Sequence, residues 1–370
     1  MRRKRRCGRR GAERPRFACD PPLSRRMAAL SQSCQPEVAM LFAYQRNGAK
    51  LRRLPPASEP EAEACLASAL WIDLYKPLPG QVEAVRQLGV EVPTLADMEE
   101  IEVSSRLYRE EGLDYMTVVL PGQTELKEQI SAPVCFVLSP ERLVTVRHHV
   151  PRPFETYPER ADKVGLGCAR PEQVFLGLIE EIVGRLADLM EGSGRSLDTV
   201  SRAIFQPPVA TRSHGAPAPE RLQELLEQVG REGERLAHIR LALLTLERAL
   251  GFFAQTVPDR IEQEGLKPAI KSLQRDIAAM EVHADFVSQR VALATDATLG
   301  MINLAQNATV KIVSVVAVLF LPPTLVASIY GMNFAHMPEL ERPWGYPGAL
   351  GLMLASAAGA WAYFKWKKWL

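Results

Sequence analysis

The chain has 370 residues, of which 47% are hydrophobic, and a formal net charge of +2. That length leaves room for a soluble domain beside a pair of membrane helices. The six cysteines show no metal-ligand or redox spacing, and the chain has neither a Gly-rich phosphate loop nor a Ser/His/Asp arrangement. These observations argue against a nucleotide-driven pump and an enzyme, and we expect reduced thiols.

The first 39 residues are strongly basic. They carry 11 Lys and Arg against 3 Asp and Glu, a net charge of +8 that leaves −6 for the rest of the chain. With several prolines and no apolar run, we expect this segment to be disordered. An organelle presequence, a patch for anionic lipid or nucleic acid, and an upstream extension before Met27 or Met40 remain as readings.

Strand and short-helix signals alternate from about residue 40 to 165, which predicts an α/β or α+β domain. Strands are expected at 40–44, 51–54, 69–74, 106–108, 115–120, 134–138 and 143–146, and short helices at 79–90 and 95–102. His148-His149 follows the last strand, and we expect a surface pair because no further ligand has metal spacing.

From Pro171 onward the periodicity is helical. One helix is expected to end near Gly192-Ser193-Gly194, a second covers 220–257, and the longest begins at Lys267. That helix has an apolar seam with 3-4 spacing. Its members are Ile270, Leu273, Ile277, Met280, Ala284, Val287, Val291, Ala294, Thr298, Met301, Ala305, Ala308, Ile312 and Val315.

A second stripe lies two residues further on, about 200° around the helix from the seam. It comprises Asp296, Gly300, Asn303, Asn307, Val310, Ser314, Ala317, Leu321 and Thr324. Polar residues on one face of a membrane helix line a water-filled path or hydrogen-bond neighbouring helices. The spacing leaves both readings open, and the polar loop that follows the helix favours the path.

Two uncharged segments, 312–329 and 343–364, are each long enough to cross a bilayer. The loop between them carries motifs that, in this order, strongly resemble the CorA family of divalent-cation channels. The motifs are Tyr330-Gly331-Met332-Asn333-Phe334, Met337-Pro338-Glu339-Leu340 and Trp344-Gly345-Tyr346-Pro347-Gly348, preceded by Phe320-Leu321-Pro322-Pro323-Thr324. The resemblance covers residues 40–370, weakly in the soluble domain, and the basic head has no counterpart in it.

The resemblance implies an α+β cytosolic domain, a long stalk helix and a two-helix transmembrane hairpin, assembled as a homopentameric funnel. The expected divisions are 1–39 basic extension, 40–165 cytosolic domain, 166–310 helical stalk, 311–329 pore-lining helix, 330–343 extracytoplasmic loop, 344–364 second membrane helix and 365–370 basic tail. Both termini would be cytosolic at a bacterial inner membrane. Lys365, Lys367 and Lys368 agree with this orientation by the positive-inside rule.

By the same resemblance the cargo is hydrated Mg²⁺, with Co²⁺ and Ni²⁺ as further candidates, and no organic cofactor or nucleic-acid partner is expected. Gly331, Met332 and Asn333 would select the ion. In the family, Mg²⁺ bound between cytosolic domains closes the channel, which makes Glu100 and Asp276 candidate regulatory ligands, with solvated surface charges as the alternative. A zinc transporter of the ZntB type and a non-conducting coiled-coil scaffold are the rival functions.

Overall fold

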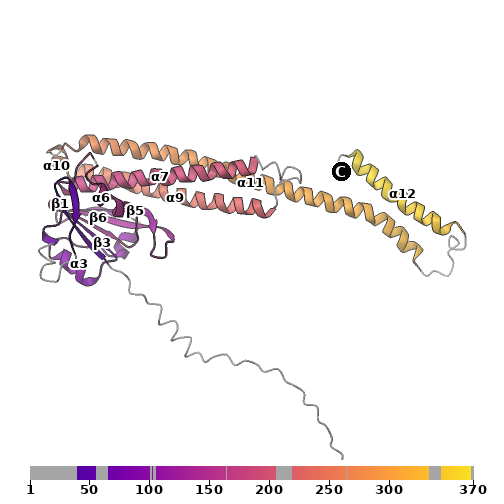
Figure 1. The fold of residues 1–370 in the computed structure, drawn as a ribbon, viewed down its shortest axis with the longest axis horizontal. Coiled ribbons are helices and arrows are strands. Elements are labelled where there is room, and N and C mark those ends of the chain that lie inside the picture. The colour runs from indigo at the N-terminus through magenta and orange to yellow at the C-terminus, as the bar shows by residue number, and fades with distance from the viewer. Residues whose placement is uncertain are drawn as a thin grey trace, which may run out of the picture.

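The computed structural model describes residues 40–55, 66–100, 102, 106–163, 165–205, 219–263, 265–332 and 343–367. The basic segment 1–39 and the loop residues 333–342 lie outside the described residues. Figure 1 shows an α/β domain at one end of a helical rod, from which a single helix continues and a shorter one folds back. The prediction of an α+β domain, a long stalk helix and a helical hairpin is confirmed.

Seven strands form one sheet in the order β2-β1-β3-β7-β6-β5-β4. The strands are β1 (Met40–Asn47), β2 (Lys50–Arg53), β3 (Trp71–Tyr75), β4 (Leu107–Glu110), β5 (Leu113–Gln123), β6 (Gln129–Leu138) and β7 (Leu143–Arg147). The pairing of β3 with β7 is parallel, and the other described pairings are antiparallel. The β1–β2 turn depends on Gly48, whose φ of +67° suits glycine.

Apolar side chains alternate between the two faces of this sheet. Ile72 and Leu74 pack in a cluster with Val85 of α3 (Pro79–Arg86) and Met98 of α4 (Leu95–Glu99). Trp71 faces the other way, toward α6 (Pro153–Arg160) and the long helices. Both faces are therefore covered, which explains why β3 is buried along its whole length.

Helices α7 (Pro171–Phe205) and α9 (Pro219–Thr256) pack against each other and against the first half of α11 (Lys267–Tyr330), after the short α10 (Pro258–Gln263). The expectation that α7 ends at Gly192-Ser193-Gly194 is wrong, because it continues to Phe205. Ser193 is fully buried in this bundle. Tertiary packing outweighs the roughly 1 kcal/mol that each glycine costs a helix interior.

The predicted seam of α11 is buried or half-buried from Ile270 to Ala305. Ala308 and Ile312 are exposed within the single chain, so a partner helix for this part of the seam stays a prediction. At that level α7 and α9 have ended, so neither of these two helices covers Ala308 and Ile312 (Figure 1). Val315 is buried again, beside the returning helix α12 (Gly345–Trp366).

Candidate functional site

The face of α11 opposite the seam is left uncovered by the residues that the structure describes. Its members Asp296, Asn303, Asn307, Val310, Ala317, Leu321 and Thr324 are exposed, and Ser314 is half-buried. The side chains of Asn303 and Asn307 form no hydrogen bond with another residue in the described part of the chain. A partner on a neighbouring helix of the same chain is therefore not observed for either amide.

Two hydroxyl groups on this face donate their hydrogens to backbone carbonyls of the same helix. Ser314 Oγ donates to the carbonyl of Val310 at 2.8 Å, and Thr324 Oγ1 donates to that of Phe320 at 2.7 Å. Each oxygen keeps its lone pairs, so it can accept a hydrogen bond from water. The face therefore presents acceptors, which suit the outward-pointing hydrogens of a hydrated cation.

Helix α11 passes through Pro322 and Pro323 without ending. Because proline has no N–H, the carbonyls of Val318 and Leu319 lose their α-helical donors. Sequence reasoning did not single out these two carbonyls. They add two backbone acceptors to the same stretch of helix as Thr324.

The helix ends where the predicted selectivity motif begins. The N–H of Gly331 donates to the Ala327 carbonyl at 3.0 Å, and that of Met332 donates to Ile329 at 3.2 Å. Gly331 has a φ of −89°, so its backbone does not require glycine. A Cβ there would lie 3.2 Å from the Ala327 carbonyl oxygen, a tight but adjustable contact. Asn333 is outside the described residues.

Among the described helices, α11 is the one long and apolar enough to span a bilayer, with a mean hydropathy of 2.3 in its most apolar window. Only 6% of that window is buried. From Lys311 to Tyr330 the helix rises about 29 Å, close to the roughly 30 Å of a hydrocarbon core. Its exposed apolar surface has the size a membrane would cover.

Helix α12 is rich in Ala and Gly and does not reach the same hydropathy, so its crossing of the membrane stays a prediction. Exposed aromatic residues stand at both of its ends, Trp344 and Tyr346 at one and Trp361 and Trp366 at the other. Such residues are enriched at the two surfaces of a membrane. This arrangement supports the prediction.

The family model described as CorA-like Mg²⁺ transporter protein matches residues 67–367. The chain belongs to the CorA family. Magnesium transport protein CorA of Yersinia pestis is 34% identical over 334 residues, covering 90% of this chain and 100% of the relative. The protein of that name from Escherichia coli K12 is 34% identical over 335 residues, with the same coverage. Members of the family are ion transporters rather than enzymes.

Solved structures share the fold at lower identity. The complete structure of the CorA magnesium transporter from Methanocaldococcus jannaschii matches with a TM-score of 0.66 at 16% identity, covering 90% of this chain and 99% of that one. The full-length CmaX protein matches with a TM-score of 0.60 at 15% identity, covering 91% of this chain and 100% of that one. The CorA-like architecture therefore extends through the hairpin.

The candidate regulatory residues of this CorA-family chain are both exposed and lie apart. Glu100 follows α4 on one side of the sheet, whereas Asp276 adjoins the core on the other side through its neighbour Ile277. Partial burial and the negative charges of Asp276 and Glu181 raise the pKa of Glu180. No group of three His, Cys, Asp or Glu that could hold a metal occurs among the described residues of one chain.

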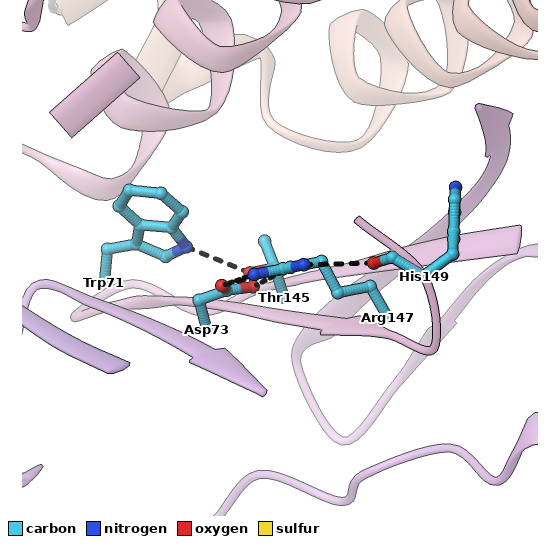
Figure 2. A network of polar contacts seen from close by, with 5 residues as sticks. All are labelled: Trp71, Asp73, Thr145, Arg147 and His149. Atoms are coloured by element: carbon cyan, nitrogen blue, oxygen red, sulfur yellow. Dashed lines mark hydrogen bonds and ion pairs between the residues drawn. The ribbon is translucent and has the colours of Figure 1, made fainter. Parts of the chain in front are cut away.

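Sequence reasoning missed a buried polar network in the sheet (Figure 2). Trp71 Nε1 donates to Thr145 Oγ1 at 3.0 Å, and that hydroxyl donates to Asp73 Oδ1 at 2.7 Å. Arg147 Nη2 donates to Asp73 Oδ2 at 2.9 Å, and its Nη1 donates to the carbonyl of His149 at 3.0 Å. A lone Asp in the apolar run 69–74 was the available signal, because a buried carboxylate needs a partner.

The expectation that His148-His149 is a surface pair is wrong for His149, which is buried. Its Nε2 lies 2.9 Å from the Leu120 carbonyl oxygen, and a Cβ on Gly122 would lie only 2.5 Å from its ring. Burial lowers the pKa of His149 to about 4. The ring is thus a neutral packing element that holds the end of β7 to β5.

Proposed function

We propose that this chain forms a homopentameric Mg²⁺ channel in a bacterial inner membrane, with both termini in the cytosol. The observation that carries the proposal is the uncovered face of α11 from Asp296 to Thr324, on a helix that ends at Tyr330, next to Gly331. Five copies around an axis would turn this face into a pore lining. The relatives named magnesium transport proteins support the choice of cargo.

The outer mouth would select the hydrated ion. Mg²⁺ holds its octahedral water shell tightly, so a selective site should offer acceptors to water hydrogens rather than ligands to the bare metal. The Asn333 side-chain oxygen and the Gly331 carbonyl, repeated around the ring beside Met332, would be neutral acceptors. A neutral ring recognises the hydrated cation without trapping it, and the same logic admits Co²⁺ and Ni²⁺ as further cargo.

Below the mouth the proposed path alternates between polar and apolar rings. Thr324 and Ser314 would contact the water shell, while Val310, Ala317 and Leu321 would form a hydrophobic constriction that can dewet. Asn307, Asn303 and Asp296 would line the cytosolic exit. Inward flow needs only an inside-negative potential, because a divalent ion gains roughly 4.6 kcal/mol across 100 mV.

Cytosolic Mg²⁺ would close this channel by binding between neighbouring subunits. Asp276 and Glu180 lie close enough for the charge of one to raise the pKa of the other, so a cation between them would relieve their repulsion. Glu100 would come from the next subunit, since one chain does not bring it to Asp276. A Mg²⁺ site shared between subunits would couple ion concentration to their packing.

The test is Mg²⁺ entry into proteoliposomes that contain the full chain, followed with an internal Mg²⁺ indicator under an inside-negative potential. Asn333→Ala should abolish entry, whereas Ser356→Ala on α12, whose hydroxyl donates to Met353 within its own helix, should leave it unchanged. Equal entry for Asn333→Ala would overturn the assigned selectivity site. Zn²⁺ entry without Mg²⁺ entry would favour a transporter of the ZntB type, and no entry of either ion would favour a scaffold.

A further inference from the structure

The end of α12 carries lysine and tryptophan side chains that the proposed pore does not use. Phe364 is buried where α12 packs along α11. At 100° per residue, Trp366 lies about 200° from Phe364 and so points away from α11, with Lys365 and Lys367 on its two flanks. Trp366 is 78% exposed, which is a large apolar surface to leave in water.

A third lysine stands at the same level on the other helix of the hairpin. Lys311 and Tyr330 are separated by 19 residues on α11, and Gly345 and Lys365 by 20 residues on α12. Lys311 and Lys365 therefore each lie about 30 Å from the hairpin turn, which is one hydrocarbon thickness. Lys311, Lys365 and Lys367 are all exposed and form a collar at one membrane surface.

The two described helices of the hairpin carry no negative charge near Lys365 and Lys367. No Asp or Glu occurs in residues 297–332 or 343–367. Among the described residues, neither Lys365 nor Lys367 forms an ion pair, and the Lys365 ammonium lies 4.6 Å above the Trp361 ring. Ammonium groups beside tryptophan rings at the end of a membrane helix match the headgroup level of a bilayer, where anionic lipids attract basic side chains.

We propose that the collar of Lys311, Lys365 and Lys367, with Trp366 between the α12 lysines, binds anionic phospholipid headgroups of the cytosolic leaflet. The inference rests on the membrane hairpin of the proposed function. It adds a lipid requirement that is independent of the ion path, because Trp366 points away from α11. Each lysine beside an anionic surface contributes about fivefold to the apparent affinity for that lipid.

The test is tryptophan quenching of the full chain in phosphatidylcholine vesicles containing an equal fraction of either brominated phosphatidylglycerol or brominated phosphatidylcholine. Every protein carries Trp344→Phe, so the membrane-level tryptophans lie at the collar. With the native collar, brominated phosphatidylglycerol should quench more strongly than brominated phosphatidylcholine. Lys365→Gln/Lys367→Gln should lower this preference for phosphatidylglycerol about 25-fold. Arginine at both positions should retain the preference, and the distant pair Lys163→Gln/Lys271→Gln should not change it.

Equal quenching by the two lipids in the native collar would overturn the lipid site while leaving the membrane hairpin intact. Quenching by neither lipid would overturn the hairpin itself. Preference that survives in the double Gln variant would exclude these lysines as its source. Loss of oligomer mass in that variant, without a change in lipid preference, would assign the collar to contact with a second copy and overturn the proposal.

Discussion

Arg147 and Asp73 form an ion pair whose side chains are 5% and 2% exposed, with 2.9 Å between Nη2 and Oδ2. The pair joins β7 to β3 across their parallel pairing. The guanidinium also lies 5.0 Å from the centre of the Tyr75 ring and 5.3 Å from that of Phe154. One buried cation therefore holds together two central strands and helix α6.

Removing one member of this pair should be far more damaging than removing a surface pair. Arg147→Met leaves the Asp73 carboxylate buried without its cation, at an expected cost of about 3–5 kcal/mol in the free energy of unfolding. Lys50→Met breaks the exposed contact with Asp162 and should cost less than about 1 kcal/mol. Denaturant unfolding of the purified full chain, followed by intrinsic fluorescence, measures both.

The double variant Asp73→Leu/Arg147→Met provides the complementary measurement. It removes both charges together, so it should be more stable than Arg147→Met alone. A double variant less stable than the single one would show that packing around Arg147, rather than the unpaired carboxylate, sets the loss.

His149 should make the stability of the α/β domain sensitive to acid. Its pKa falls to about 4 in the folded chain and returns to about 6.5 on unfolding. Between these values the unfolded chain binds the extra proton, so stability is complete above pH 6.5 and falls as the pH drops toward 4, by about 3 kcal/mol. Thermal unfolding measured from pH 7.5 to 4 tests this.

His149→Gln cannot titrate and retains an N–H that can donate to Leu120, so it should flatten the acid side of that profile. His283→Gln, on the exposed part of α11, should reproduce the native profile. If the two variants lose stability in parallel with falling pH, another group is responsible for the acid sensitivity.

The edge of β5 depends on a side chain of the stalk. Strand β4 pairs with β5 only as far as Met116, and beyond it the Val119 N–H donates to Thr245 Oγ1 of α9 at 3.1 Å. Thr245→Val keeps the shape of the side chain but leaves the buried Val119 N–H without an acceptor. This should lower the free energy of unfolding by about 1–3 kcal/mol. The control Thr199→Val, on the exposed face of α7, should hardly change the free energy of unfolding. Hydrogen exchange of the Val119 amide tests this, because it should become faster in Thr245→Val and stay unchanged in Thr199→Val.

A polar residue in the proposed constriction should ease ion entry. Leu321→Ser places a hydroxyl in the apolar ring, which favours wetting, so Mg²⁺ entry should rise and be less inhibited by internal Mg²⁺. Leu354→Ser on α12, which is 72% exposed, makes the same change away from the proposed pore. Flux assays in proteoliposomes compare them, and equal effects would argue against a constriction at Leu321.

The sequence by itself determined the helical faces of α11. A spacing of three and four residues fixes angular position around a helix, so the seam from Ile270 to Ala305 and the opposite stripe through Asn307 could be assigned before any contact was known. It also determined the strands and the hairpin, because alternation, turn residues and uncharged length are local properties.

Only the tertiary structure decided which distant residues meet. Arg147 reaches Asp73 because β3 and β7 pair in parallel, and no local pattern specifies that pairing. Bundle packing carries α7 through its glycines, and the lengths of α7 and α9 set where the seam of α11 loses its cover. His149 is buried because the chain after β7 crosses to β5 at Gly122. Each outcome depends on contacts between segments far apart in the chain, whose free energy outweighs local propensity.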